Sequence, residues 1–440
     1  MSPTPPRRAR RLSPLFLALI GFGALTFCAT AAFGIYNIPS VKQRIDQALY
    51  WRIQFARAEL RDLLNPPQAY LPTPEPPGAG TAQASLPDST LAPQFEDSAP
   101  TAAPTSTAIP TVTLQSPPTA TPTAAPRPNR VILTGVVHEY QRYNNCGPAA
   151  ASMTMSYWGF TGDQLDAASW LKPNQGDYNV RPSEIEWYIN TVEGSWLGAY
   201  YRVGGTLDLL QTLIAAGYPV IVEEGYELSD KGWMGHYLPL TGYDADLQVF
   251  YAQDSFYGPD QTVAFANLNR DWQSFNRTFI VLFPNEREAE VQALLGPYAD
   301  LTGSYQIALD QSLAETTADP NNAFAWHNLG SNHNYFGDFT SAAAAFDRAR
   351  EIGLPWRMLW YQSGIYRAYY NVGRYSDVVT LADVTLASMT EPNHEESLYW
   401  RGWARYALGD LPDAVNNFQR ALYYNHNFAD ARDALTQLGQ

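Results

Sequence analysis

The chain has 440 residues, 45% of them hydrophobic, which is enough for two or three domains with sizeable cores. Its formal net charge of -15 and its pI near 4.8 argue against a nucleic-acid partner. Phosphate binding needs clustered Lys and Arg, and these gather only at the extreme N-terminus.

The first 36 residues have the pattern of a membrane anchor. A basic stretch with Arg7, Arg8, Arg10 and Arg11 precedes an uncharged apolar run. Such a run of roughly 20 residues crosses a bilayer as a helix, whereas the apolar part of a cleavable signal is usually ~7–15 residues long. We expect a cytoplasmic segment at 1–13 and a transmembrane helix at 14–36, with the rest of the chain outside the cytoplasm. The alternative is a signal peptide cleaved near Ala29 to Ala32.

Two further segments precede the folded domains. From Val41 to Leu64, apolar residues recur at helical spacing between basic ones, which predicts an amphipathic juxtamembrane helix within residues 37–66. Residues 67–129 are mainly Pro, Thr, Ala and Ser, which bury too little apolar surface to offset the entropy of ordering. We therefore expect a disordered linker that holds the folded part away from the membrane.

Residues 130–285 are predicted to form one α+β domain. Helices are expected at Cys146–Trp158, near Arg181–Val192 and near Thr206–Ala216. Strands are expected first at "RVILTGV" and then, after the helices, at "PVIVEE", "HYLPLTGYD", "VFYAQD" and "RTFIVLFP". Because most strands follow the helices, the sheet is expected to be antiparallel.

Residues 289–440 are predicted to be helical throughout and to repeat. Turn glycines recur about 34–36 residues apart, at Gly303, Gly337, Gly373 and Gly409. Small residues upstream of these turns would let paired helices approach closely; they include Gly330, Gly364 and Gly402. The pattern resembles the tetratricopeptide repeat, which implies an all-α solenoid that binds a protein or peptide segment on its concave face. The alternative is a structural clamp on the neighbouring domain.

Cys146 is the only cysteine outside the first thirty residues, since Cys28 lies in the apolar run. Its place at the start of a predicted helix favours a thiolate, because unpaired backbone N–H groups and the helix dipole lower the pKa of a thiol there. Asn144 or Asn145 can cap that helix, and Pro148 suits its first turn. These features predict a nucleophile, and the alternative is an inert buried cysteine.

Three other residues complete the predicted chemistry. Gln141 can donate its side-chain amide to the oxyanion that develops at a substrate carbonyl. His236 can act as the general base, with Gly235 leaving space beside it for substrate, and His138 is the alternative base. Asp254, on the next predicted strand, lies beside His236 if the two strands form an antiparallel hairpin.

The order Gln141, Cys146-Gly147-Pro148, Gly235-His236 and Asp254 resembles the papain-like cysteine peptidases, and most closely the bacteriocin-processing family, the thirty-ninth cysteine peptidase family, in a stand-alone form. The resemblance covers about Val131 to Pro284. It implies cleavage of peptide bonds in exported substrates, here at a bacterial cell membrane with the C-terminal domains extracytoplasmic. The sequence departs from the family in lacking a transporter domain and in having Ser255 where many relatives have proline. Because Ser255 affects only the turn after a strand, we expect this change to matter little.

Two functions are consistent with the sequence. The first is a membrane-anchored peptidase whose repeats recognise a protein partner, with transpeptidase or amidase action as variants of the same chemistry. The second is a non-catalytic binding or assembly protein with an inactive papain-like domain. We expect no cofactor and no metal, because one cysteine and the scattered histidines His327, His333, His394 and His426 give no ligand cluster.

Overall fold

The computed structural model describes residues 52–53, 56–57, 60–63, 69–74, 127–174, 176–228 and 232–440. The chain divides into two compact units, Met1–Pro66 and Pro67–Gln440. In the first unit, all described residues are helical, and they lie within the predicted juxtamembrane helix. Among the helices that the structure describes, none is both long and apolar enough for a membrane crossing, and the predicted span at 14–36 falls outside the described ranges.

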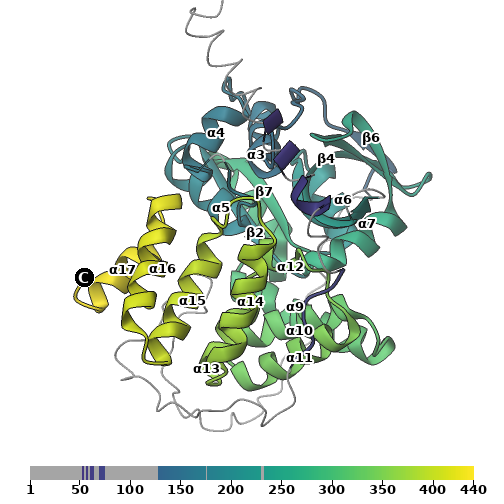
Figure 1. Ribbon diagram of the computed structural model, residues 1–440. Coiled ribbons are helices and arrows are strands. Elements are labelled where there is room, and N and C mark those ends of the chain that lie inside the picture. The colour runs from purple at the N-terminus through teal and green to yellow at the C-terminus, as the bar shows by residue number, and fades with distance from the viewer. Residues whose placement is uncertain are drawn as a thin grey trace, which may run out of the picture. The chain divides into compact units, whose positions relative to one another are not determined.

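An antiparallel sheet of seven strands forms the centre of the first domain in the second unit (Figure 1). The strands are β1 (Arg130–Ile132), β2 (Leu197–Arg202), β3 (Val220–Leu228), β4 (Gly232–Asp244), β5 (Val249–Asp254), β6 (Gly258–Ala264) and β7 (Phe279–Pro284). Their order is β2-β7-β3-β4-β5-β6, with β1 paired to β4. The predicted mixed α/β domain with an antiparallel sheet is therefore confirmed.

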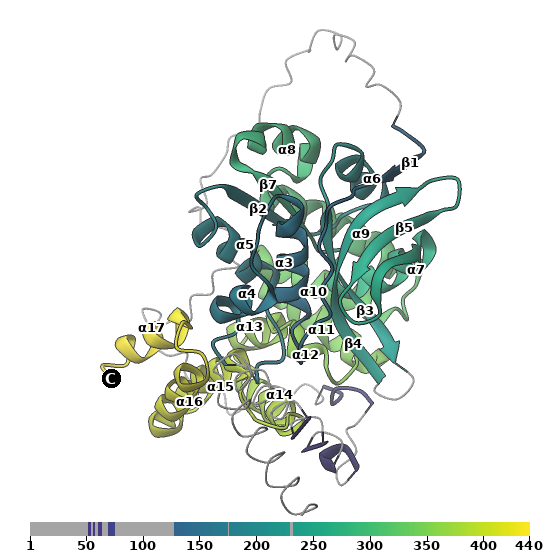
Figure 2. The same cartoon turned by 90° about the horizontal axis from the view of Figure 1, so that it is seen from above.

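Helices cover both faces of this sheet (Figure 2). They are α3 (Cys146–Tyr157), α4 (Gln164–Leu171), α5 (Pro182–Thr191), α6 (Leu207–Ala215), α7 (Phe265–Trp272) and α8 (Glu288–Leu295), with short 3₁₀ turns η1 (Gln273–Phe275), η2 (Asn285–Arg287) and η3 (Gly296–Tyr298). Ile221 of β3 packs with α3, α4 and α5, whereas its neighbours Val220 and Val222 pack with α6, α7 and α8. Burial on both faces explains the nearly continuous apolar runs in β3 and β7.

The predicted order of elements was partly wrong. Strand β2 lies between α5 and α6, at a place where no strand was expected, and it pairs with β7 along its whole length. Its sequence, "LGAYYR", is short and nearly fully buried, so it has no alternation of polar and apolar residues to mark it. The predicted strand at "RVILTGV" is also reduced to the three residues of β1.

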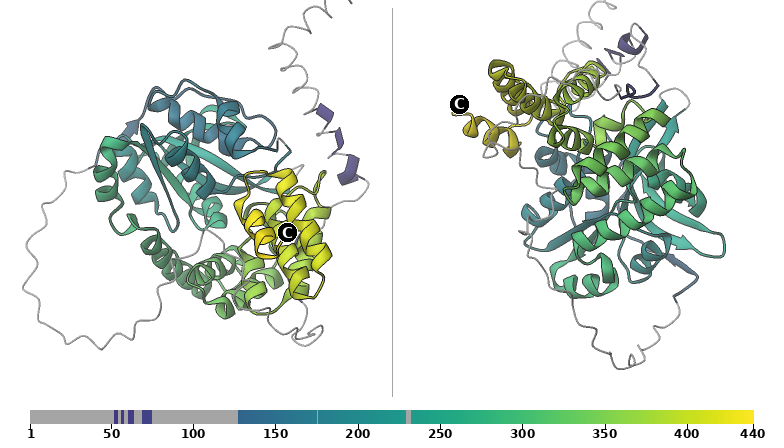
Figure 3. Two further views of the ribbon diagram at one scale, coloured as in Figure 1. Left: turned by 90° about the vertical axis from the view of Figure 1, so that its left-hand side faces the viewer. Right: turned by 90° about the horizontal axis from the view of Figure 1, so that it is seen from below.

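The rest of the chain is helical, as predicted (Figure 3). Its helices are α9 (Leu301–Ala318), α10 (Ala323–Tyr335), α11 (Phe339–Ile352), α12 (Met358–Tyr361), α13 (Gly364–Asn371), α14 (Tyr375–Ala387), α15 (Glu395–Ala407), α16 (Leu411–Tyr424) and α17 (Ala429–Gln437). Gly337, Gly373 and Gly409 have positive φ angles of 77°, 78° and 88° between successive helices, as turn glycines do. Gly303 instead lies inside α9, so the first predicted turn was wrong.

Close packing explains two of the small residues in the helices. A side chain at Gly330 would meet the ring of Phe346 at 2.8 Å, and one at Gly402 would meet the ring of Phe418 at 2.7 Å. Glycine at these positions makes room for a phenylalanine ring from the second helix of each pair. As a result, α10 packs closely on α11, and α15 packs closely on α16.

The helical region shares its core with the α/β domain. Tyr178, Trp233 and Phe275 of the α/β domain are buried in the same apolar cluster as α11 to α17. Trp233 stacks on Phe275 and meets Tyr361 edge to face. In addition, the side-chain amide of Asn328 in α10 donates to the Gln273 carbonyl at 2.7 Å. These contacts favour the clamp alternative for the role of the helical region.

Part of the predicted linker is also packed on the helical region. Residues 69–74 run beside the turn after α11, where Leu71 donates its N–H to the Leu354 carbonyl at 2.9 Å and is itself buried. Arg350 donates to the carbonyl of Pro72 at 2.8 Å. For residues 69–74, this pairing differs from the disordered state that was expected; residues 75–126 of the predicted linker lie outside the described ranges.

Candidate active site

Cys146 is the first residue of α3, and its thiol is free and half-buried. Asn145 occupies the cap position as predicted, but its side chain makes no capping hydrogen bond. It is buried and donates to the side-chain carbonyl of Gln164 at 2.9 Å instead. The N–H groups of the first turn of α3 are therefore not capped by this side chain, and they favour negative charge at the thiol.

The loop before the thiol is held in place by α4. The side-chain carbonyl of Gln164 accepts from the Arg142 N–H at 2.7 Å, and its amide donates to the Tyr140 carbonyl at 2.9 Å. The ammonium of Lys172 donates to the carbonyl of Asn144 at 2.7 Å, where the backbone has a left-handed φ of 48°. Neither Gln164 nor Lys172 was predicted to have a role, because no motif marks either residue.

His236 and Asp254 are in direct contact. The Nε2 atom of His236 lies 3.1 Å from Oδ1 of Asp254, and both side chains are buried. The antiparallel pairing of β4 with β5 brings them together, as the predicted hairpin required. The same carboxylate oxygen also accepts the N–H groups of Phe256 and Tyr257 at 2.7 and 3.0 Å. Because Nε2 faces Asp254, the other ring nitrogen of His236 is the one available to the thiol.

The charges of the three groups stabilise one another. Burial opposes ionisation of Cys146, but the hydrogen bond and charge of His236, the Tyr237 N–H and the Lys172 ammonium together lower the pKa of the thiol below 9.0. Burial likewise disfavours charge on His236, yet its hydrogen bonds and charge interactions with Asp254 and Cys146 raise the pKa of the imidazole to about 10. The pKa of Asp254 is lowered, because His236 and two N–H groups outweigh its burial. The three groups thus stabilise a thiolate at Cys146 beside an imidazolium at His236.

Gln141 is held by Ser255. The Ser255 hydroxyl donates to the side-chain carbonyl of Gln141 at 2.8 Å, and the Gln141 N–H donates to the Ser255 carbonyl at 2.8 Å. With its carbonyl held in this way, the amide nitrogen of Gln141 is the end that can donate to an oxyanion. The expectation that Ser255 affects only the turn after the strand was wrong, because this buried hydroxyl makes a contact that proline could not make.

The helical region reaches this site through Tyr361 at the end of α12. The Gly235 N–H donates to the Tyr361 hydroxyl. Burial raises the pKa of this hydroxyl, and Cys146 lies close enough for the charge of its thiolate to raise the pKa further. A side chain at Gly235 would meet the ring of Phe275 at 2.5 Å and that of Tyr361 at 2.9 Å. The space beside Gly235, which was predicted to take substrate, is thus filled by protein. His138, the alternative base, contacts the backbone carbonyl of Asp254 at 2.9 Å.

The structure brings Cys146, His236 and Asp254 together and places Gln141 at Ser255, next to Asp254. None of the described residues forms a group of three or more His, Cys, Asp or Glu side chains that could hold a metal ion. Tyr361 could not have been found from the sequence, because it lies 125 residues after His236 in a region with a different repeat pattern.

The comparison with protein families agrees with this geometry. Residues 133–280 match the model of the Peptidase_C39 like family, and this span contains all four predicted site residues. A search of curated proteins gives no match to the chain. The family match and the fold support a papain-like peptidase domain, and they suggest a cysteine peptidase. The helical region lies outside the matched span.

Proposed function

We propose that the protein is a cysteine peptidase that hydrolyses peptide bonds with Cys146 as nucleophile. The observation that carries the proposal is the position of His236, whose imidazole contacts Asp254 at 3.1 Å and is hydrogen-bonded to the thiol of Cys146. Neutral thiols are weak nucleophiles, so an ion pair of this kind supplies the reactive form.

In the proposed reaction, the thiolate of Cys146 attacks the carbonyl carbon of the scissile bond. The backbone N–H of Cys146 and the amide of Gln141 stabilise the resulting oxyanion. The imidazolium of His236 then gives its proton to the leaving amine, and the C–N bond breaks to leave a thioester. His236 next removes a proton from water, whose oxygen attacks the thioester carbonyl. The C–S bond then breaks, which releases the carboxylic acid and restores the thiolate of Cys146 and the imidazolium of His236. Asp254 orients the imidazole and stabilises its charge throughout.

Cleavage of a mixture of peptides, followed by mass spectrometry, tests this function. We expect new peptide termini with the parent protein and none with Cys146→Ala. Cleavage that persists in Cys146→Ala would contradict the proposal, and so would the absence of cleavage when the mixture contains every pair of neighbouring residues. Transfer to an added amine, detected in the same spectra, would indicate transpeptidation.

We also propose the cellular setting and the role of the helical region. The apolar run at 14–36 would anchor the chain in a bacterial membrane with its C-terminal domains outside the cytoplasm. The glycine turns and the close contacts at Gly330 and Gly402 support tetratricopeptide repeats that recognise a protein or peptide. Protease added to intact cells should digest the C-terminal domains, and protection of those domains would contradict this orientation.

A further inference from the structure

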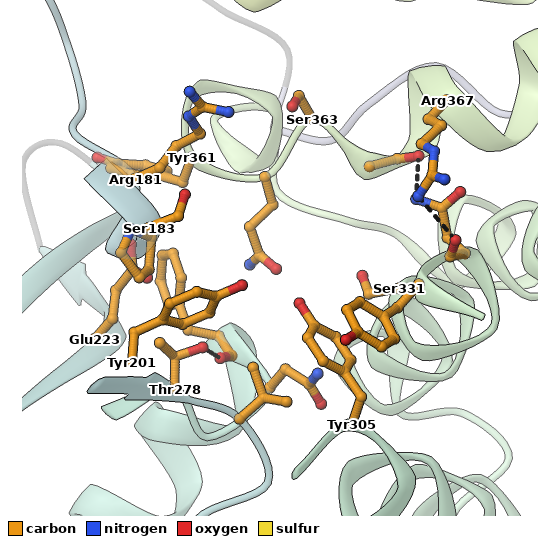
Figure 4. Close-up of a pocket in the computed structure, with 18 of the residues that line it drawn as sticks. Arg181, Ser183, Tyr201, Glu223, Thr278, Tyr305, Ser331, Tyr361, Ser363 and Arg367 are labelled. Atoms are coloured by element: carbon orange, nitrogen blue, oxygen red, sulfur yellow. Dashed lines mark hydrogen bonds between the residues drawn. The ribbon is translucent and has the colours of Figure 1, made fainter. Parts of the chain in front are cut away.

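A cavity of about 140 Å³ lies between the sheet and the helical region (Figure 4). Its mouth consists of half-buried residues that include Ser183, Ser331 and Ser363. Its floor is buried and is formed by Tyr201, Glu223, Phe275, Tyr335, Tyr361 and Trp400. The floor thus combines five aromatic rings with one carboxyl group.

Glu223 has little in its surroundings to balance its charge. The side chain is 3% exposed, and the neighbouring Tyr237 hydroxyl donates its proton to the Val180 carbonyl at 2.7 Å. Burial, together with the nearby thiol of Cys146, raises the pKa of the Glu223 carboxyl well above its ordinary value of 4.5, and the Tyr237 hydroxyl offsets this only in part. Tyr361 is a third titratable group that interacts with this carboxyl. A cation in the cavity would give Glu223 the opposite charge that it lacks.

The aromatic floor suits the same kind of ligand. Tyr335 stacks on Tyr305 with ring centroids 3.7 Å apart, and Figure 4 shows Tyr201, Tyr305 and Tyr361 around the cavity. Aromatic rings attract ammonium groups through their negative faces, and the attraction grows when water is excluded. A carboxyl group among aromatic rings therefore favours an alkylammonium over a neutral or anionic ligand.

Two arginines also line the cavity, and each makes a contact with another protein group. The guanidinium of Arg181 lies 3.2 Å from Glu184 and 3.4 Å from Glu396. Arg367 donates to the Asn334 carbonyl at 3.0 Å, on the opposite side of the cavity from Glu223 in Figure 4. Glu223 is the acidic group of the floor, and it is the group with which a cationic ligand can pair.

We propose that this cavity binds an alkylammonium group, supplied by a lysine side chain or by the N-terminal amine of a peptide. Its volume is close to that of cavities of ~150 Å³ that take up benzene, which is about the size of an aminobutyl chain. Glu223 pairs with the ammonium, and the rings of Tyr201 and Tyr361 surround the methylene groups. Both Glu223 and Tyr361 interact electrostatically with Cys146. Selection of lysine-bearing substrates by this cavity rests on the proposed function of the Cys146 thiol.

Calorimetric titration of the full-length chain with butylammonium chloride tests the proposal. We expect saturable binding accompanied by release of a proton, because pairing with the cation lowers the raised pKa of the Glu223 carboxyl. Glu223→Gln keeps the shape of the side chain and should weaken binding by roughly tenfold or more and abolish the proton release. Glu224→Gln, the same change one residue along β3, is the matched control and should leave binding unchanged. Absence of saturable binding, or equal binding by Glu223→Gln, would overturn the proposal.

A second variant keeps the test decisive if Glu223→Gln fails to fold. Ser331→Phe places a ring in the mouth of the cavity and should block binding while the carboxyl remains. The source of the amine is assigned by comparing Nα-acetyl-lysinamide, which offers a side-chain amine, with alaninamide, which offers an α-amine. Binding of either compound supports the proposal, and binding of neither contradicts it. Cys146→Ala should still show saturable binding of the amine although it cannot cleave peptides, so failure of the peptidase proposal and failure of the ammonium site give different results.

Discussion

The α/β domain and the helical region contribute to the site in different ways. In the α/β domain, Cys146, His236 and Asp254 are motif residues, and strand pairing and one helix start bring them together. The helical region has a repeat pattern that predicts only its own helices, yet it places Tyr361 beside the thiol and forms one wall of the cavity. Motif residues thus identify the reacting groups, whereas contacts between the two regions determine their environment.

The largest effect is expected when the two regions are separated. A chain that ends after Asp300 keeps α8 and η3 on the sheet and would expose Tyr178, Trp233 and Phe275, which share their buried cluster with the helical region. Burial of such a side chain contributes about 1.5–3 kcal/mol, so exposure of three removes much of a typical domain stability of about 5–15 kcal/mol. We expect loss of the cooperative thermal transition, measured by circular dichroism. If the shortened chain melts as the full-length chain does, the helical region is not a clamp.

Apart from loss of the Cys146 nucleophile itself, removal of the imidazole should be the most damaging single change within the α/β domain. His236→Ala takes away the proton donor and the positive charge that stabilises the thiolate. Proton transfer by such a group contributes about 10²–10⁴-fold, so we expect a loss of that order in kcat/KM for peptide hydrolysis. His138→Ala is the matched control, because His138 contacts only the backbone of Asp254 through its ring nitrogen. An equal loss in His138→Ala would mean that the base has been assigned wrongly.

Asp254 should matter less than His236, because it orients the base and does not transfer a proton. Asp254→Asn keeps the shape of the side chain and removes the charge that helps to raise the pKa of His236 to about 10. Hydrogen bonds to charged groups contribute about 1.5–3 kcal/mol, which corresponds to a loss of roughly 10- to 100-fold. The alkaline limb of the pH–rate profile should also move to lower pH. An unchanged alkaline limb would show that Asp254 does not stabilise the imidazolium.

The smallest effect is expected at Ser255. Ser255→Ala removes one neutral hydrogen bond to Gln141, so we expect a loss in kcat of roughly two- to tenfold. Gln141→Ala removes the proposed oxyanion donor itself and should cost on the order of 10²–10³-fold. The rate of thiol alkylation should stay the same in both variants, because no oxyanion forms in that reaction. A double variant no worse than Gln141→Ala would confirm that Ser255 acts through Gln141.

Much of the fold could be predicted from the sequence, for identifiable reasons. The start of α3 follows from the helix formers after Cys146, and β3 and β7 follow from their apolar runs. The glycine turns after α10, α13 and α15 follow from their spacing. Strand β2 was missed because it is short and buried on both faces, so alternation does not mark it.

The site was predictable only where a residue type implies a role. A lone cysteine at a helix start, a glycine-histidine pair and an aspartate on the next strand each suggest a chemical task. Lys172, Glu223 and Tyr361 act through contacts between segments far apart in the chain, and nothing in their local sequence indicates those contacts. Gly235 shows the same limit, because its small size accommodates Phe275 and Tyr361 and not the predicted substrate.

The ionisation of Cys146 tests the central claim most directly, because it needs no substrate. Alkylation by iodoacetamide, followed as a function of pH, reports the fraction of thiolate. We predict rapid alkylation at about pH 6, where a free thiol with a pKa near 8.5 reacts slowly, and a return to slow alkylation in His236→Ala, where burial of the thiol is no longer opposed by the imidazolium. A thiol that titrates near 8.5 or above, with no change in His236→Ala, would contradict the assignment of Cys146 as an activated nucleophile.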